Sequence, residues 1–196
     1  MANHVESVKQ ASFPLVGKDE AWKRVRSGML GFCSGSEPIS KAIEGATHSP
    51  WSHVFLIWGP VFQRVWLTIE ATLEKGVHVG LLSDYIAGGD GDLAFASRID
   101  PTSDLPVEMN STFDAELALL DESYATAGLI QEGAHKLLKI IPPDWNKNQC
   151  YCSGLQWRGS QASTTPFPAR DGAPTPEDLW CDPNTKAIFG LLKGKS

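Results

Sequence analysis

The sequence predicts an α+β fold, in which a run of short strands precedes a run of helices. Between residues 26 and 99, short segments rich in β-branched and aromatic residues are separated by glycine, proline and charged residues. This pattern is typical of strands joined by tight turns. After Pro101, apolar residues recur at spacings of three and four, which is the period of an α-helix. Strands followed by helices indicate α+β rather than an alternating α/β arrangement.

The expected strands are short and lie close together along the chain. The first falls within residues 26–34 and is followed by an expected short helix, and four more fall within residues 52–59, 65–72, 76–86 and 92–99. Parallel pairing requires long crossover connections, which the short links among these four do not provide. We therefore expect an antiparallel sheet or barrel, built as a meander and packed against helices.

The expected helices follow from apolar spacing and from proline positions. Residues 37–47 have helical spacing, as do residues 113–130 and 132–141, and Pro142 and Pro143 end the last of these. A further helix is expected to start near Cys152. The proline-rich and glycine-rich stretch 164–184 is expected to be a surface loop, in which Thr175–Asp178 resembles the start of one final helical turn.

Length, composition and charge exclude several classes of protein. The 196 residues are 42% hydrophobic, which fits one domain spanning residues 1–196 with a core of about 22–182. The net charge is −6 and the basic residues are scattered, so we expect no nucleic-acid partner. No signal peptide or membrane-spanning segment is recognised, so a soluble, cytoplasmic protein is favoured. The oligomeric state is not indicated.

Cys152 is the strongest candidate nucleophile among the four cysteines, which we expect to be free thiols. A helix N-terminus lowers the pKa of a thiol, because unpaired N–H groups and the helix dipole favour the thiolate. The same N–H groups are suited to an oxyanion hole. Most free cysteines are simply buried, so this position alone favours a structural role.

His53 and Glu70 supply the remaining parts of a catalytic triad. Of the five histidines, only His53 opens a strongly predicted strand, and it is the candidate general base. Glu70 lies in an apolar strand, where a lone carboxylate is costly and a hydrogen-bonded partner is expected. If the two strands form a hairpin, Glu70 orients the imidazole and His53 accepts the thiol proton.

Other polar and aromatic residues near these positions are weaker candidates. Trp51, Ser52 and Ser153 are possible substrate contacts, although Trp51 fits a core role equally well. His78 alternates with Val77 and Val79, so we expect its side chain to face water. Three zinc-competent side chains from distant segments make a weak metal signature, and we expect no metal or other cofactor.

Four segments in order resemble the motifs of the permuted papain-like hydrolases. They are GFCSGSEPISKAIEGATHSPWSHVFLIW, VWLTIEAT, CYCSGL and TPEDL, within about residues 26–182. This family belongs to the NlpC-type superfamily, in the branch with the YiiX-like and YaeF-like proteins. Its motif order of His, acid and Cys corresponds here to His53, Glu70 and Cys152, and Cys150 is not the match. The resemblance implies a permuted papain-like fold. The family often has Glu where this chain has Gly154.

The sequence therefore predicts a cysteine hydrolase that acts through a Cys152 acyl-enzyme. The resemblance implies amide or peptide substrates, such as small γ-linked amides or cell-wall-type peptides. Acyl transfer and cleavage of thioesters or lipid esters are alternatives with the same triad. A zinc protein and a non-catalytic binding protein of the same fold also remain open.

Overall fold

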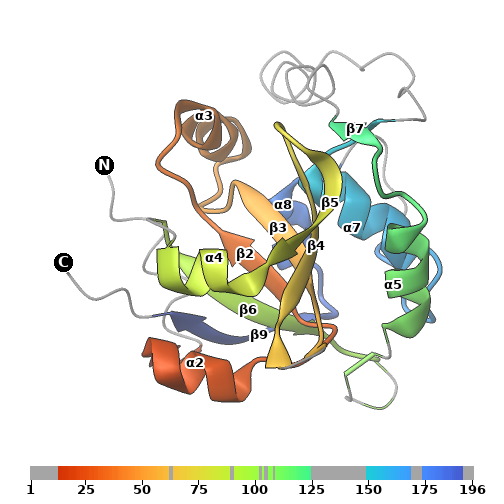
Figure 1. Ribbon diagram of the computed structural model, residues 1–196, viewed down its shortest axis with the longest axis horizontal. Coiled ribbons are helices and arrows are strands. Elements are labelled where there is room, and N and C mark those ends of the chain that lie inside the picture. Colours follow the sequence, from red (N-terminus) through yellow and green to blue (C-terminus); the bar gives the residue numbers. More distant parts are fainter. Residues whose placement is uncertain are drawn as a thin grey trace.

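The computed structural model describes residues 13–61, 64–88, 91–101, 103, 106–107, 109–124, 149–168 and 174–191. These residues build a central sheet in the strand order β1-β9-β6-β2-β3-β4-β5 (Figure 1). The strands are β1 (Leu15–Val16), β2 (Leu30–Cys33), β3 (His53–Trp58), β4 (Leu67–Thr72), β5 (Gly76–Leu81), β6 (Leu93–Arg98) and β9 (Thr185–Leu191). A second, two-stranded sheet pairs β7 (Ser123–Tyr124) with β8 (Gln149–Cys150).

The meander expected for the four strands between residues 52 and 99 is present only in part. β3, β4 and β5 pair in turn and antiparallel, but the fourth strand, β6, does not pair with β5, and β2 pairs with β3 instead. β6 returns to the free side of β2, and β9 then pairs with β6. The α+β class is confirmed. The sheet is nevertheless mixed and open rather than wholly antiparallel or closed, since β1 pairs with β9 in parallel and β1 and β5 form the edges.

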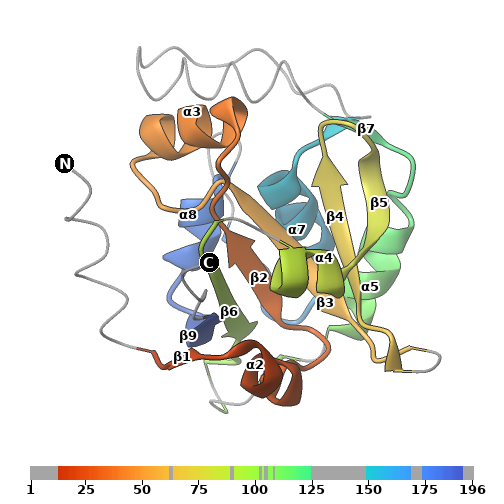
Figure 2. The ribbon, with the colours of Figure 1, turned by 60° about the vertical axis from the view of Figure 1, so that its left-hand side comes forward.

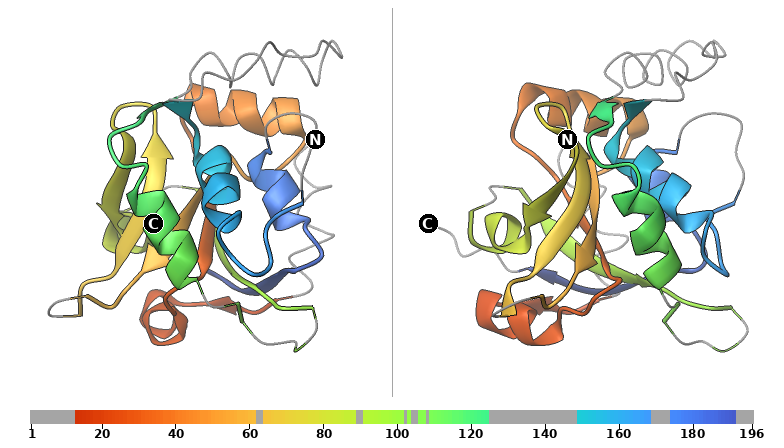
Figure 3. Two further views of the ribbon diagram at one scale, coloured as in Figure 1. Left: turned by 90° about the vertical axis from the view of Figure 1, so that its right-hand side faces the viewer. Right: turned by 45° about the vertical axis from the view of Figure 1, so that its right-hand side comes forward.

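Helices cover both faces of the sheet. They are α2 (Lys18–Arg24), α3 (Pro38–Thr47), α4 (Leu82–Gly88), α5 (Asn110–Leu117), α7 (Cys152–Ser160) and α8 (Pro176–Trp180). Figure 2 shows α3 across one end of the sheet, and Figure 3 shows α5 beside α7. Because both faces are covered, β3 is apolar at every position from Val54 to Trp58 rather than alternating with polar residues.

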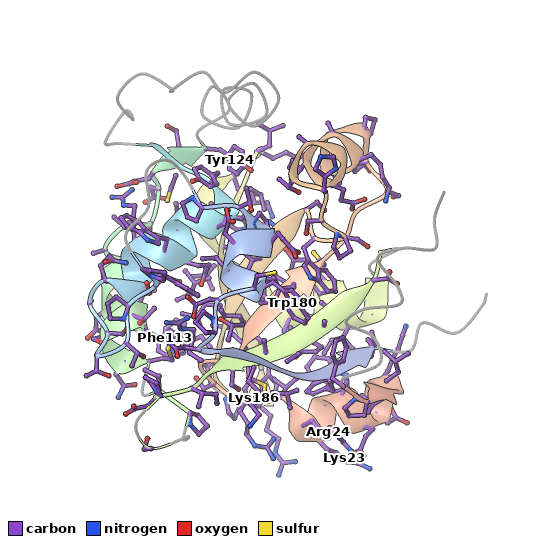
Figure 4. All side chains as sticks on the ribbon, turned by 180° about the vertical axis from the view of Figure 1, so that it is seen from behind. Lys23, Arg24, Phe113, Tyr124, Trp180 and Lys186 are labelled. Atoms are coloured by element: carbon purple, nitrogen blue, oxygen red, sulfur yellow. The ribbon has the colours of Figure 1, made fainter. Side chains whose placement is uncertain are left out.

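Side chains alternate along β3 between two cores. Val54 and Leu56 belong to the core shared with α7 and α8, where Trp180 packs against Phe32 and Trp51. Trp180 is labelled in Figure 4. Phe55 belongs to the other core, beneath α2 and α4. β3 is therefore held in place by packing on both of its faces.

Two expected segments are wrong in their detail. The strand expected over 76–86 ends at Leu81, and α4 follows, because Leu82 and Ile86 bury one helical face. The helix expected over 113–130 begins earlier, at Asn110, and ends at Leu117. There the chain turns through Asp121, which has a φ of 68° and whose N–H donates to the Val77 carbonyl. Residues 125–148, with the helix expected over 132–141, lie outside the described residues.

Candidate active site

Cys152 is the first residue of α7, as its sequence position predicts. Tyr151 is extended and acts as the N-cap, and its carbonyl accepts the first helical hydrogen bond from the Leu155 N–H. The N–H groups of the first turn therefore lack partners within the helix and lie next to the thiol. The side chain of Cys152 is almost fully buried, with 2% of the residue exposed.

His53 opens β3, and Glu70 lies on the neighbouring antiparallel strand β4. The two side chains face the same side of the sheet, with 2.9 Å between His53 Nε2 and Glu70 Oε2. This contact engages Nε2 and leaves Nδ1 as the imidazole nitrogen for the thiol. His53 is 18% exposed at its side chain, whereas Glu70 is 4% exposed.

Several donors converge on the buried Glu70 carboxylate. The Tyr85 hydroxyl donates to Oε2, and Thr68 Oγ1 donates to Oε1 at 2.7 Å. Burial opposes ionisation, but hydrogen bonds from His53, Tyr85 and Thr68 outweigh it and lower the pKa of Glu70 from 4.5 to about 2. Glu70 is thus a carboxylate at neutral pH. A Cβ at Gly80 would lie 2.2 Å from Glu70 Oε1, so glycine there makes room for the carboxylate.

Cys152 and His53 shift each other's protonation. Burial lowers the pKa of His53, but hydrogen bonds to Cys152 and Glu70 overcome this and raise it well above 6.5. Burial raises the pKa of the Cys152 thiol, but the hydrogen bond with His53 and its charge lower it by more. The pKa of Cys152 is therefore below its ordinary value of 9.0. The arrangement therefore favours a thiolate beside an imidazolium.

Backbone groups complete the surroundings of Cys152 Sγ. The N–H groups of Val54 and Ser153 help to lower the pKa of the thiol by hydrogen bonding to it. The Ser52 carbonyl lies 4.0 Å from Sγ, where a neutral thiol donates to it. Cys150 contrasts with Cys152, since burial raises the pKa of its thiol to about 12. Only one of these two neighbouring cysteines is electrostatically suited to be a nucleophile.

The three side chains expected to contact substrate lie inside the protein. Trp51 packs in the aromatic core, and its backbone N–H donates to Ser49 Oγ at 2.9 Å. Ser153 Oγ donates to the Pro174 carbonyl at 2.7 Å, and Ser52 Oγ lies 3.4 Å from the Cys33 carbonyl. Substrate contact by these residues stays a prediction, and their structural contribution is to fix the backbone around Cys152 and His53.

Two further residues lie around Glu70 and were not predicted from the sequence. Tyr85 lies on α4, which was expected to be strand, and the spacing of Leu82 and Ile86 is the local signal that could have indicated a helix there. The expectation that His78 faces water is wrong, because its Nε2 lies 3.8 Å from Glu70 Oε1. Glu70 and His78 are directly opposite each other on β4 and β5. The alternation of side chains along β5 correctly placed His78 on the opposite face from Val77, but it could not show that Glu70 lies on that face.

Comparison with known proteins gives a structural match. No family model and no curated protein matches the sequence. The crystal structure of YiiX from Escherichia coli O157:H7, titled a metalloprotein and DUF1105, matches with a TM-score of 0.61 and 18% identity. The match covers 83% of this chain and 96% of YiiX. At this identity the similarity shows a shared fold.

The described residues offer no cluster of three or more His, Cys, Asp and Glu side chains that could hold a metal ion. Within the same residues, no helix is both long enough and apolar enough to cross a membrane. The chemistry that the site does support is that of a thiolate, an imidazole and an orienting carboxylate.

Proposed function

We propose that the protein is a cysteine-dependent hydrolase of amide or peptide bonds, with a permuted papain-like fold of the NlpC type. The observation that carries the proposal is the arrangement at the start of α7, where Cys152 hydrogen-bonds to His53 and His53 hydrogen-bonds to Glu70. The fold shared with YiiX supports the family part of the proposal. A small γ-linked amide or a cell-wall-type peptide is the substrate class that fits the resemblance.

In the proposed reaction, the Cys152 thiolate attacks the carbonyl carbon and forms a C–S bond. The N–H groups at the start of α7 stabilise the resulting oxyanion. The His53 imidazolium then gives its proton to the leaving amine as the C–N bond breaks, and a thioester remains. Neutral His53 next takes a proton from water, whose oxygen attacks the thioester. Breaking the C–S bond releases the acid and restores the thiolate.

A cysteine substitution tests this function. Cys152→Ala should reduce hydrolysis of a panel of small amides and short cell-wall-type peptides by at least roughly a thousandfold, because it removes the nucleophile. The melting temperature should change little, since only one sulfur atom is removed. Cys150→Ala is the matched control, because it removes a buried thiol two residues away, and it should remain active. Activity that survives Cys152→Ala would contradict the mechanism.

The acyl acceptor separates hydrolysis from its closest alternatives. The same thioester intermediate transfers its acyl group if an amine or a lipid alcohol replaces water. Incubation with acyl probes, including thioesters and lipid esters, in the presence of an added amine or lipid alcohol distinguishes these reactions. Formation of the free acid alone supports a hydrolase, and an acylated acceptor supports a transferase.

A metal-dependent function is the second candidate, because the similar YiiX carries the word metalloprotein in its title. His53, Glu70 and Cys152 are side-chain types that bind zinc. Metal analysis of the purified protein separates the two functions. One metal ion per chain, lost on Cys152→Ala, would favour the metal site. A metal-stripped protein that keeps its activity would favour the thiolate mechanism.

A non-catalytic relative is distinguished by the reactivity of its thiol. Alkylation of Cys152 by iodoacetamide is followed across pH, and mass spectrometry identifies the modified peptide. A midpoint well below about 8.5, the value of a free thiol, supports an enzyme. An unshifted midpoint supports a binding protein.

A further inference from the structure

We propose that Tyr85 is a positioning residue of this site, and that its hydroxyl holds the Glu70 carboxylate against His53. The hydroxyl donates to Glu70 Oε2, which is the same oxygen that contacts His53 Nε2. It also lies 3.2 Å from His53 Nε2. One oxygen atom of Glu70 therefore meets both the phenol and the imidazole.

The surroundings of Tyr85 fix its hydroxyl in place. Its ring stacks on Phe55 with 4.1 Å between ring centroids, and it lies parallel to the His53 ring at 6.0 Å. Phe55 is fully buried on β3, only two residues from His53. The strand that carries the imidazole thus also carries the platform for the phenol.

Tyr85 acts as a donor and not as an acid or base. Burial and the negative charge of Glu70 raise the pKa of its hydroxyl far above 10.0, so the phenol stays protonated at neutral and moderately alkaline pH. A permanently protonated donor on Oε2 lowers the proton affinity of Glu70 and restricts its rotation. Both effects keep an ionised carboxylate in line with His53, and this stabilises the imidazolium beside the Cys152 thiolate.

The two oxygens of Glu70 provide a matched comparison. Tyr85 donates to Oε2, which contacts His53, whereas Thr68 donates to Oε1, which faces away from that contact. Deleting either hydroxyl removes one hydrogen bond from the same carboxylate. Only the Tyr85 deletion removes the donor on the oxygen that orients the imidazole, so the two variants separate positioning from general stabilisation of the charge.

The test is the pH dependence of Cys152 alkylation by iodoacetamide in the full-length chain. The inference rests on the proposed function for its effect on turnover, but this readout requires no substrate. Tyr85→Phe keeps the ring on Phe55 and should move the alkylation midpoint upward by about one pH unit. Thr68→Val should move it less than half as far. In a Glu70→Gln background, adding Tyr85→Phe should cause no further shift, because Tyr85 acts through the carboxylate.

Three results would overturn the inference. They are a midpoint unchanged by Tyr85→Phe, a midpoint that moves downward, and an equal shift with or without Glu70. An unshifted midpoint in the unsubstituted chain would instead count against the proposed function. A loss of activity in Cys152→Ala together with an unchanged Tyr85→Phe profile would remove only the role of Tyr85.

Discussion

At the scale of single residues, Glu70 is the buried charge that the site has to stabilise. It is nearly fully buried, yet it is ionised, because donors on both oxygens compensate for the loss of water. In the unfolded chain those donors are lost and the carboxyl binds a proton near its ordinary pKa of 4.5, against about 2 in the folded protein. The folded state therefore binds the proton more weakly than the unfolded state does.

This difference predicts how stability depends on pH. The contribution of ionised Glu70 is fully present above pH 4.5 and is lost as pH falls toward 2. When pH falls from 4.5 to 2, the unfolding free energy of the unsubstituted protein should decrease by roughly 3 kcal/mol more than that of Glu70→Gln. Urea unfolding at several pH values measures the difference. Glu74→Gln, which removes an exposed carboxyl from the turn after β4, is the control, and parallel curves for Glu70→Gln and the unsubstituted protein would contradict the prediction.

Some of these residues were accessible from sequence and others were not. Cys152 follows Tyr151 at a helix start, and His53 and Glu70 lie in recognisable neighbouring strands, so local patterns and motif order were sufficient to identify them. Tyr85 and His78 take part only because α4 and β5 fold over Glu70, and no local pattern shows which side chains meet across elements. The burial of Trp51 likewise depends on Trp180, far along the chain.

At the scale of elements, the packing of α5 against α7 contains an unusual carboxyl group. Glu116 of α5 is fully buried, and a Cβ at Gly159 of α7 would lie 2.5 Å from its side chain. Neither of its carboxyl oxygens has a hydrogen-bond partner among the described residues, and the same holds for Gln156 Oε1. Burial raises the pKa of Glu116 well above 4.5, although Gln156 opposes the shift. In its protonated form Glu116 carries no charge and gains one O–H donor, which lowers the cost of burying it.

Glu116 gives a prediction of opposite sign to that for Glu70. Its folded-state pKa is raised, so its contribution to stability is retained below pH 4.5 and is lost as pH rises from there toward the folded-state value. Glu116→Gln keeps a donor without a charge, and its melting temperature relative to the unsubstituted protein should therefore rise between pH 4.5 and pH 8. Asp114→Asn, which removes an exposed carboxyl from the same helix, is the control. If the melting temperatures of Glu116→Gln and the unsubstituted protein differ by the same amount at pH 4.5 and pH 8, then the pKa of Glu116 is not raised in the folded protein.

Gln156 connects this helix packing to the site. Its Nε2 donates to the carbonyl of Ile69, the residue before Glu70, at 3.3 Å. α7 therefore carries the thiol at its first residue and supports the strand of the orienting carboxylate from its second turn. The start of α7 is predictable from the sequence, but this support is not, because no local pattern shows that α7 packs across β3 and β4.

At the scale of the whole molecule, the sheet order joins distant parts of the chain. The antiparallel pairing of β3, β4 and β5 follows from short connections, and these were visible in the sequence, whereas β2 reaches β3 through α3. β6 and β9 pair on the other side of β2, and the strand at residues 185–191 was not predicted from the sequence. That pairing is determined by long-range packing, such as the stacking of Phe95 on Phe189, and not by a turn.

A buried ion pair stabilises this long-range arrangement. Arg98 ends β6, and its Nη1 contacts Asp182 Oδ1 at 2.6 Å in the connection between α8 and β9. Nη2 donates to the Thr165 carbonyl at 2.7 Å, and the guanidinium stacks on the Phe167 ring at 3.8 Å. The Arg98 and Asp182 side chains are only 2% and 3% exposed, so neither charge has water as a substitute partner.

Removing one partner of this pair should therefore destabilise the entire fold. Asp182→Ala leaves the Arg98 guanidinium buried without its counter-charge, which typically costs about 3–5 kcal/mol of unfolding free energy. Glu20→Gln is the contrasting control, because it breaks an exposed pair with Arg24, which Figure 4 shows at the periphery on α2. That variant should leave the melting temperature nearly unchanged. Chemical denaturation of both variants tests the prediction, and an Asp182→Ala protein as stable as Glu20→Gln would show that the pair does not join β6 to the C-terminal strand.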